Sequence, residues 1–173
     1  MSMSTSGDNL SKRIVNMLRP SRTIPNTPWR ADSTWSLGTG KHHIQRLAIL
    51  LFGLTIFGIG EAFLVVTGLG NSPWVVLSEG ISINTFLNIG ESTLLVSVLV
   101  LLLWIPLRQK PGFGTIANIV VIAAAIEVGL FFIPSVDNTF AKYFYILFGI
   151  ALVGAGSSLY ITCGLGTGPH DGL

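Results

Sequence analysis

Charge is what this sequence has least of. Only 10% of its 173 residues are Asp, Glu, Lys or Arg, against about 25% in typical soluble domains. Half of the residues are hydrophobic, and the mean hydropathy is +0.67. A chain with so few charges cannot cover its apolar surface with polar groups in water, so an ordinary soluble domain is excluded and lipid is the expected solvent. We expect no nucleic-acid partner.

Cysteine and the common catalytic groupings are also scarce. The single cysteine, Cys163, lies in an apolar run, so it can form no internal disulfide. It has no Cys or His neighbour at the spacing of metal ligands. The sequence also contains no Ser, His and Asp in catalytic order and no phosphate-binding glycine loop. We therefore expect no enzyme, no metal site and no cofactor.

What the chain does contain is a glycine-rich stretch that occurs twice. Residues 51–77 read LFGLTIFGIGEAFLVVTGLGNSPWVVL, and residues 147–173 read LFGIALVGAGSSLYITCGLGTGPHDGL. At a shift of 96 positions, without a gap, ten of the 27 residues are identical, and five of these are glycines. Each copy ends in Gly-Leu-Gly-x-x-Pro. This pattern predicts a hydrophobic helix, a break and the start of a new helix.

The apolar runs predict four transmembrane helices. The first, about 47–67, has 21 residues, enough at 1.5 Å per residue to cross a hydrocarbon core of about 30 Å. The others are expected at about 92–107, 115–133 and 143–163. Residues 1–43 are rich in Ser, Thr, Asn and Pro and predict a disordered cytoplasmic tail. A short amphipathic helix on the membrane surface, at about 10–19, is the alternative.

Local signals mark the ends of these helices. Gly68 is placed to cap the first span, and Ser72 before Pro73 has the pattern of an N-cap and a first helical residue. About two turns would follow, at 74–80, in a segment that is either re-entrant or interfacial. Asn88 with Glu91 predicts a capping box before the second span.

The basic residues predict the orientation. Seven Lys or Arg precede the first span or lie in its first turn, two follow the second span, and only Lys142 falls on the other side. The positive-inside rule then puts the N-terminus in the cytoplasm. Because three spans separate the starts of the two copies, the copies run in opposite directions, as an inverted-topology repeat does. We assign 44–141 to the first repeat and 142–173 to the start of a second, truncated repeat.

Three motifs resemble those of a known family. GLGNSPWVVL, GFGTIAN at 112–118 and GLGTGPHDGL, in this order, are similar to those of the YczE-like group of bacterial membrane proteins, which is grouped with YitT and YyaS proteins. The resemblance covers about 46–173. Val75 and His170 depart from the Asp and Arg of the family pattern, whereas Trp74, Asp171 and Gly172 match it. The resemblance implies a bacterial cytoplasmic (inner) membrane protein and brings no established reaction or substrate.

Glu61 and Glu127 are the only acidic residues within the expected spans. A charge at a helix centre costs about 3 kcal/mol on insertion scales, so such groups usually face the bundle interior or a wet cavity. Both lie at a similar depth, and we expect them to be able to meet in the site of a proton- or cation-coupled carrier. The alternative is a purely structural carboxyl, bonded to a neighbouring helix or solvated near the surface.

The glycines allow two interpretations. Gly58 with Ala62, and Gly154 with Ser158, are small-xxx-small pairs that predict close helix packing. The two Gly-Leu-Gly breaks either line a cavity, with helix N-termini aimed at an anion or polar solute, or form ordinary interfacial turns. The candidate solute-binding residues are Glu61, Gly68, Gly70, Pro73, Trp74, Asn118, Glu127, Gly164, Gly166, Pro169, His170 and Asp171.

The predicted fold is therefore an all-α polytopic membrane protein. It has four of six transmembrane helices, an inverted-topology repeat and short broken or re-entrant helices. The expected function is that of a small transporter or permease-like protein with a site between the two repeats, whose partners are the lipid bilayer and a small polar or ionic solute. The alternative is a membrane scaffold or accessory protein that transports nothing. The sequence does not determine the oligomeric state.

Overall fold

The computed structural model describes residues 43–107, 111–166 and 168–169. The expected tail at 1–43 lies outside the described residues except for His43, and His170 and Asp171 also lie outside them. Every regular element in the described part is a helix, which confirms the all-α class. The helices are α2 (His43–Thr67), α3 (Pro73–Asn84), α4 (Ile89–Leu103), α5 (Phe113–Phe132) and α6 (Thr139–Thr162).

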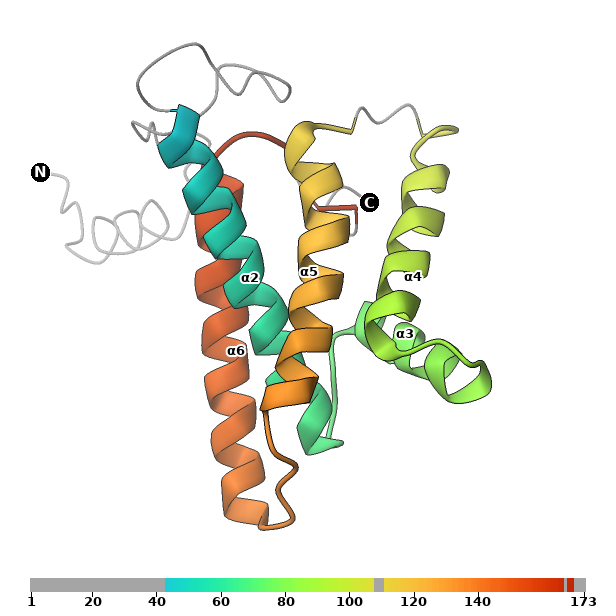
Figure 1. The fold of residues 1–173 in the computed structure, drawn as a ribbon, viewed down its shortest axis with the longest axis vertical. Coiled ribbons are helices and arrows are strands. Elements are labelled where there is room, and N and C mark those ends of the chain that lie inside the picture. The colour runs from blue at the N-terminus through green and yellow to red at the C-terminus, as the bar shows by residue number, and fades with distance from the viewer. Residues whose placement is uncertain (1–42, 108–110, 167, 170–173) are drawn as a thin grey trace, which may run out of the picture.

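The helices form a bundle in which α2 lies between α6 and α5 (Figure 1). On the other side of α5 lies α4, and α3 packs against α4. In Figure 1, α2 runs downward and α6 runs upward, so these two neighbouring helices are antiparallel. The central core includes Leu54 of α2, Ile126 of α5 and Tyr160 of α6, all at most 2% exposed.

Three of the helices are long and apolar enough to cross a membrane: α2, α5 and α6. The predicted second span, at about 92–107, corresponds to α4, an apolar helix that begins at Ile89, ends at Leu103 and is shorter than these three: its 15 residues extend about 22 Å at 1.5 Å per residue. Regular helix ends at Leu103, and the N–H groups of Trp104 and Ile105 bond to carbonyls three residues back. Pro106 follows, which has no N–H to donate. At its other end, α4 does not extend as far as α2 and α6, whose lower ends lie below its first turn (Figure 1).

The helix ends follow the local signals in the sequence. Asn88 Oδ1 accepts from the Glu91 N–H at 2.7 Å, and the Asn88 N–H donates to Glu91 Oε2 at 3.0 Å, which confirms the capping box. Gly68 ends α2 with φ +62°, a left-handed conformation that favours glycine. Pro73 is the first residue of α3, after Ser72 as N-cap. The helix that follows has 12 residues, however, which is longer than the predicted two turns.

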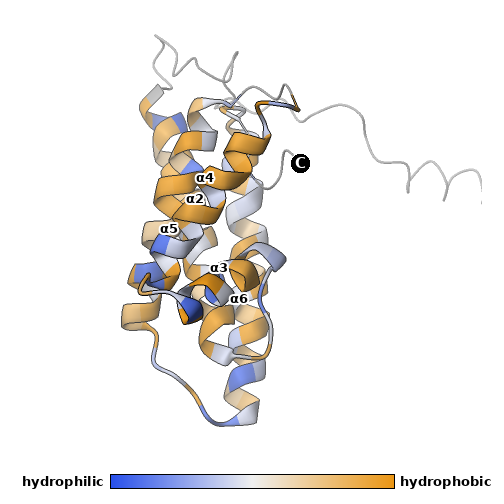
Figure 2. Ribbon diagram, turned by 90° about the vertical axis from the view of Figure 1, so that its right-hand side faces the viewer, coloured by the Kyte–Doolittle hydropathy of each residue, from blue (hydrophilic) through white to orange (hydrophobic). Residues whose placement is uncertain are grey.

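The helices consist mostly of hydrophobic residues (Figure 2), and many of these side chains are exposed on the outside of the bundle. Large hydrophobic side chains such as Phe131, Phe140 and Leu147 are 83%, 82% and 70% exposed. Hydrocarbon in place of water removes the cost of this exposure, and the helices satisfy the backbone within themselves, as a membrane requires. The chain is therefore an integral membrane protein.

Glycines set the close packing of α2 on its neighbours. A Cβ on Gly156 would lie 2.6 Å from the Gly53 carbonyl oxygen, and one on Gly60 would lie 2.9 Å from the Gly149 carbonyl oxygen, so α2 and α6 touch backbone to backbone. Gly58 approaches Ala125 of α5 in the same way, and Gly129 of α5 approaches Ala62. The predicted close packing at Gly58 and Ala62 is thus confirmed.

The predicted packing role of Gly154 with Ser158 is wrong for the described part of the chain. No described atom lies within 4 Å of the place where a Gly154 Cβ would stand, and both residues are exposed. The glycines of α6 that face α2 are Gly149 and Gly156 instead. A small-xxx-small spacing identifies close-packing candidates, but it does not say which of several glycine-bearing faces meets the neighbouring helix.

Candidate functional site

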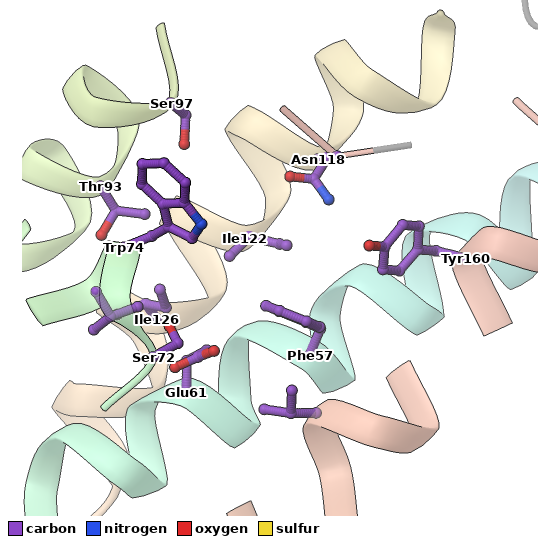
Figure 3. Close-up of a pocket in the computed structure, with 13 residues that line it drawn as sticks. Phe57, Glu61, Ser72, Trp74, Thr93, Ser97, Asn118, Ile122, Ile126 and Tyr160 are labelled. Carbon is purple, nitrogen blue, oxygen red and sulfur yellow. The ribbon is translucent and has the colours of Figure 1, made fainter. Parts of the chain in front are cut away.

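A cavity of about 210 Å³ lies at the centre of the bundle, and each of the five described helices contributes to it (Figure 3). Its lining combines aromatic and aliphatic side chains with a few polar groups. The lining residues are Phe57, Glu61, Ser72, Trp74, Val75, Thr93, Ser97, Asn118, Ile122, Ile126, Val153, Tyr160 and Gly168. A mostly apolar lining with a small number of polar groups is typical of a small-molecule site.

Glu61 is the one acidic residue among the described residues that line this cavity, and none of them is Lys, Arg or His. Its side chain is only 2% exposed. The Ser72 hydroxyl and backbone lie against the carboxyl, but Oε2 has no hydrogen-bond partner among the described residues. A buried polar atom without a partner is costly, so this oxygen needs a proton, a water molecule or a bound group.

The start of α3 comes into contact with this carboxyl. Ser72 is the N-cap of α3 in extended conformation, and its side chain makes no capping hydrogen bond within the helix. A helix N-terminus carries partial positive charge and favours a carboxylate nearby. The sequence predicted an anion or polar solute at the helix N-terminus after Pro73. In the structure, the Glu61 carboxyl of the protein itself lies at this position.

Of the predicted binding residues, Glu61, Trp74 and Asn118 come together at the cavity. Asn118 is 5% exposed on α5, one and two turns before Ile122 and Ile126, which also line the cavity. Residues four apart share a helix face, so this stripe of α5 points inward. In Figure 3 the Asn118 amide and the Trp74 ring enter from different helices, α5 and α3.

Glu127 does not join Glu61. Its Oε2 accepts the Gly90 N–H at 3.1 Å, and it lines a second pocket, of about 260 Å³, between α4 and α5. The predicted shared site of the two acids is thus not formed. Glu127 directly follows Ile126, and successive residues are about 100° apart around a helix, so Glu127 faces α4 while Ile126 faces the cavity. The structural alternative, a carboxyl bonded to a neighbouring helix, describes Glu127.

The glycines of the two breaks do not line the cavity. Gly68 and Gly70 are exposed, with φ of +62° and +154°, and the equivalent glycines Gly164 and Gly166 have φ of +68° and +113°. These positive values explain why both breaks carry glycine. Pro73 is exposed, and it too is outside the lining.

The second break is held by contacts with the start of α5 and with Trp104, which follows α4. The Gly114 N–H donates to the Leu165 carbonyl at 2.8 Å. The Trp104 Nε1–H donates to the Pro169 carbonyl at 3.0 Å, and both of these side chains are buried. Of the described residues in this segment, Gly168 reaches the cavity, whereas Gly164, Gly166 and Pro169 do not.

The other lining residues were not among the predicted binding residues, and they include the aromatic Phe57 and Tyr160 and the polar Thr93 and Ser97. Thr93 and Ser97 stand four apart on the otherwise apolar α4 and are 6% and 3% exposed. Polar side chains on one face of a membrane helix usually point into the bundle. That spacing is a signal from which these two residues could have been found, whereas an aromatic residue such as Phe57 carries no such signal.

Comparison with known proteins gives a consistent set of relatives. A family model described as "Family of unknown function (DUF6198)" matches residues 44–173. An uncharacterized protein of Haemophilus influenzae is 43% identical over 157 residues, which cover 91% of this chain and 70% of that protein. No solved structure matches the chain.

Two relatives come from Bacillus subtilis. The uncharacterized membrane protein YczE is 28% identical over 128 residues, or 73% of this chain and 57% of its own length. The uncharacterized protein YyaS is 26% identical over 125 residues, or 70% of this chain and 62% of its own length. The chain thus spans less than two thirds of these two relatives.

Proposed function

Given that the chain belongs to the DUF6198 family and is a YczE-like membrane protein, we propose that it is a small transporter or permease-like protein of the bacterial inner membrane. One observation carries the proposal. A buried carboxyl with an unsatisfied oxygen lines a cavity at the centre of a membrane bundle. Buried ionisable groups at membrane depth are costly and commonly mark the path of a solute or ion.

An inverted repeat is the second part of the proposal, and reciprocal contacts between α2 and α6 support it. Gly53 of the first copy corresponds to Gly149 of the second, and Gly60 corresponds to Gly156. Gly53 meets Gly156, and Gly60 meets Gly149. Gly53 thus contacts the residue equivalent to Gly60, and Gly60 contacts the residue equivalent to Gly53. Such an exchange is the pattern of two units related by a two-fold axis.

The next contacts follow the same rule. Gly156 approaches Phe57, while Gly60 approaches Val153, the residue equivalent to Phe57. The two breaks also share their left-handed glycines, and they lie at opposite ends of the bundle, the first at the lower end and the second at the upper end in Figure 1. An axis in the membrane plane relates the repeats of many secondary transporters in this way.

We further propose that the N-terminus is cytoplasmic, because nine of the ten Lys and Arg residues fall on that side. In this orientation α3 is a re-entrant segment. Trp74 and Val75, in its first turn, line the central cavity, and a backbone that breaks at membrane depth is tolerated where it lines a cavity.

The test uses the full chain in liposomes with a panel of cationic, anionic and neutral solutes. Thermal unfolding is measured with and without each solute, followed by uptake of any solute that stabilises the protein. Saturating ligand at 100 times its Kd should stabilise by about 2.7 kcal/mol. We expect saturable stabilisation and uptake for one solute class, both lost in Glu61→Gln and retained in Glu127→Gln. No stabilisation by any solute, together with stoichiometric co-purification of one partner protein, would instead support the accessory role.

A further inference from the structure

The described lining of the central cavity contains one acidic side chain and no basic one. The acidic one is Glu61, whose carboxyl is buried and whose Oε2 has no hydrogen-bond partner in the part of the chain that the structure describes. The described lining residues include no Lys, Arg or His that could neutralise it. Burial without a counter-ion disfavours the ionised form of this carboxyl by several kcal/mol, and a bound positive charge would stabilise that form, so the cavity is suited to a cation.

The rest of the lining fits an organic cation better than a metal ion. Three aromatic side chains surround the cavity, each from a different helix: Phe57 of α2, Trp74 of α3 and Tyr160 of α6 (Figure 3). Phe57 and Tyr160 meet edge to face, with ring centroids 6.2 Å apart. Aromatic faces attract ammonium groups, and several rings together form the usual recognition site of quaternary ammonium compounds.

A transition-metal ion would lack its usual cluster of ligands here. No group of three or more His, Cys, Asp or Glu side chains occurs in the part of the chain that the structure describes. An anion is disfavoured as well, because Glu61 already lies against Ser72, the N-cap of α3. A free anion would meet this carboxyl at the N-terminus of α3, where Ser72 and Trp74 line the cavity.

The volume limits the size of the ligand. The cavity measures about 210 Å³. A cavity of about 150 Å³ holds benzene, so this one has room for roughly eight non-hydrogen atoms. A small ammonium compound with a compact apolar body is within this limit.

We propose that the central cavity binds a small organic cation, with its ammonium group paired to Glu61 and its apolar body against the rings of Phe57, Trp74 and Tyr160. The inference rests on the proposed function and deepens it, because it names the substrate class of the same site. Asn118, from the opposite wall, supplies an amide to a polar group at the far end of such a ligand (Figure 3).

Choline is the probe, and its neutral carbon isostere dimethylbutanol is the matched control ligand. Both are titrated into the full chain in nanodiscs, and binding is measured by calorimetry. We expect choline to bind at least about tenfold more tightly than the isostere, since the two differ only in the charge that Glu61 would pair with. Equal affinities, or no binding of choline, would overturn the proposal. This comparison needs no mutant and so cannot fail through misfolding.

Two variants locate the site. Glu61→Gln keeps the shape of the side chain and should weaken choline binding by at least about tenfold, while leaving the isostere unaffected. Trp74→Leu removes an aromatic face and should also weaken choline more than the isostere. Glu127→Gln, a membrane acid outside the cavity, should bind choline as the wild type does. Wild-type choline affinity in Glu61→Gln would contradict the assignment.

The outcomes separate the two proposals. Choline binding without passage of choline across liposomes would refute the transport function and leave the cation site standing. Uptake of a neutral or anionic solute that is not inhibited by any organic cation would refute the cation site and leave the transport function standing.

Discussion

Replacing Gly156 by Ala tests the contact on which the α2 and α6 pairing depends. The new Cβ would lie 2.6 Å from the Gly53 carbonyl oxygen, 2.7 Å from the Phe57 nitrogen and 2.9 Å from the Phe57 Cα. All three are backbone atoms, so no side chain can rotate to make room, and the two helices must separate. Overpacking of this kind typically costs about 1 to 3 kcal/mol.

Gly154→Ala is the matched control, two residues earlier on the same helix. Its Cβ would have no described atom within 4 Å. Both substitutions gain the same intrinsic helix propensity, up to about 1 kcal/mol. The difference between the two variants therefore isolates the helix contact.

The assay is the free energy of unfolding in mixed detergent micelles, with increasing SDS and far-ultraviolet circular dichroism as the signal. We expect Gly156→Ala to be less stable than Gly154→Ala by about 1 to 3 kcal/mol, and Gly154→Ala to be at least as stable as the wild type. Equal stability of the two variants would refute the close backbone contact between α2 and α6.

Three further substitutions test single contacts by the same unfolding measurement. Asn88→Ala breaks the capping box with Glu91 and should cost about 1 kcal/mol, whereas Asn88→Ser should retain most of the stability. Glu127→Leu leaves the Gly90 N–H without its acceptor and should cost about 1 to 3 kcal/mol, with Glu127→Gln close to the wild type. Gly68→Ala forces a side chain into the left-handed region and should cost about 1 to 2 kcal/mol, less for Gly68→Asn. Each prediction is contradicted if the conservative variant is destabilised as much as its partner.

Local chemistry made the helix ends predictable. A capping box needs only residues three apart, so Asn88 with Glu91 fixed the start of α4 within a few residues. The end of α4 was less predictable, because 104–107 continue the apolar run although the regular helix stops at Leu103. Hydropathy records whether residues can enter lipid, but it does not record how far a helix extends.

The directions of the two membrane acids could not be predicted. Sequence places Glu61 and Glu127 at similar depth, but depth does not determine which way a side chain points around the helix axis. A membrane helix that is apolar on all sides offers no amphipathic pattern from which the inward face can be inferred. Trp74 and Asn118 were found because their motifs were singled out, whereas Phe57 and Tyr160 required the three-dimensional arrangement.

The most direct test of the proposed solute site is a measurement of charge movement. The full chain is reconstituted into proteoliposomes on a solid-supported membrane, and the current is recorded after a choline concentration jump. We predict a transient current for the wild type and for Glu127→Gln, and none for Glu61→Gln at equal amounts of folded protein. A current of wild-type size in Glu61→Gln, or no current from folded wild-type protein, would contradict a cation-transporting site at Glu61.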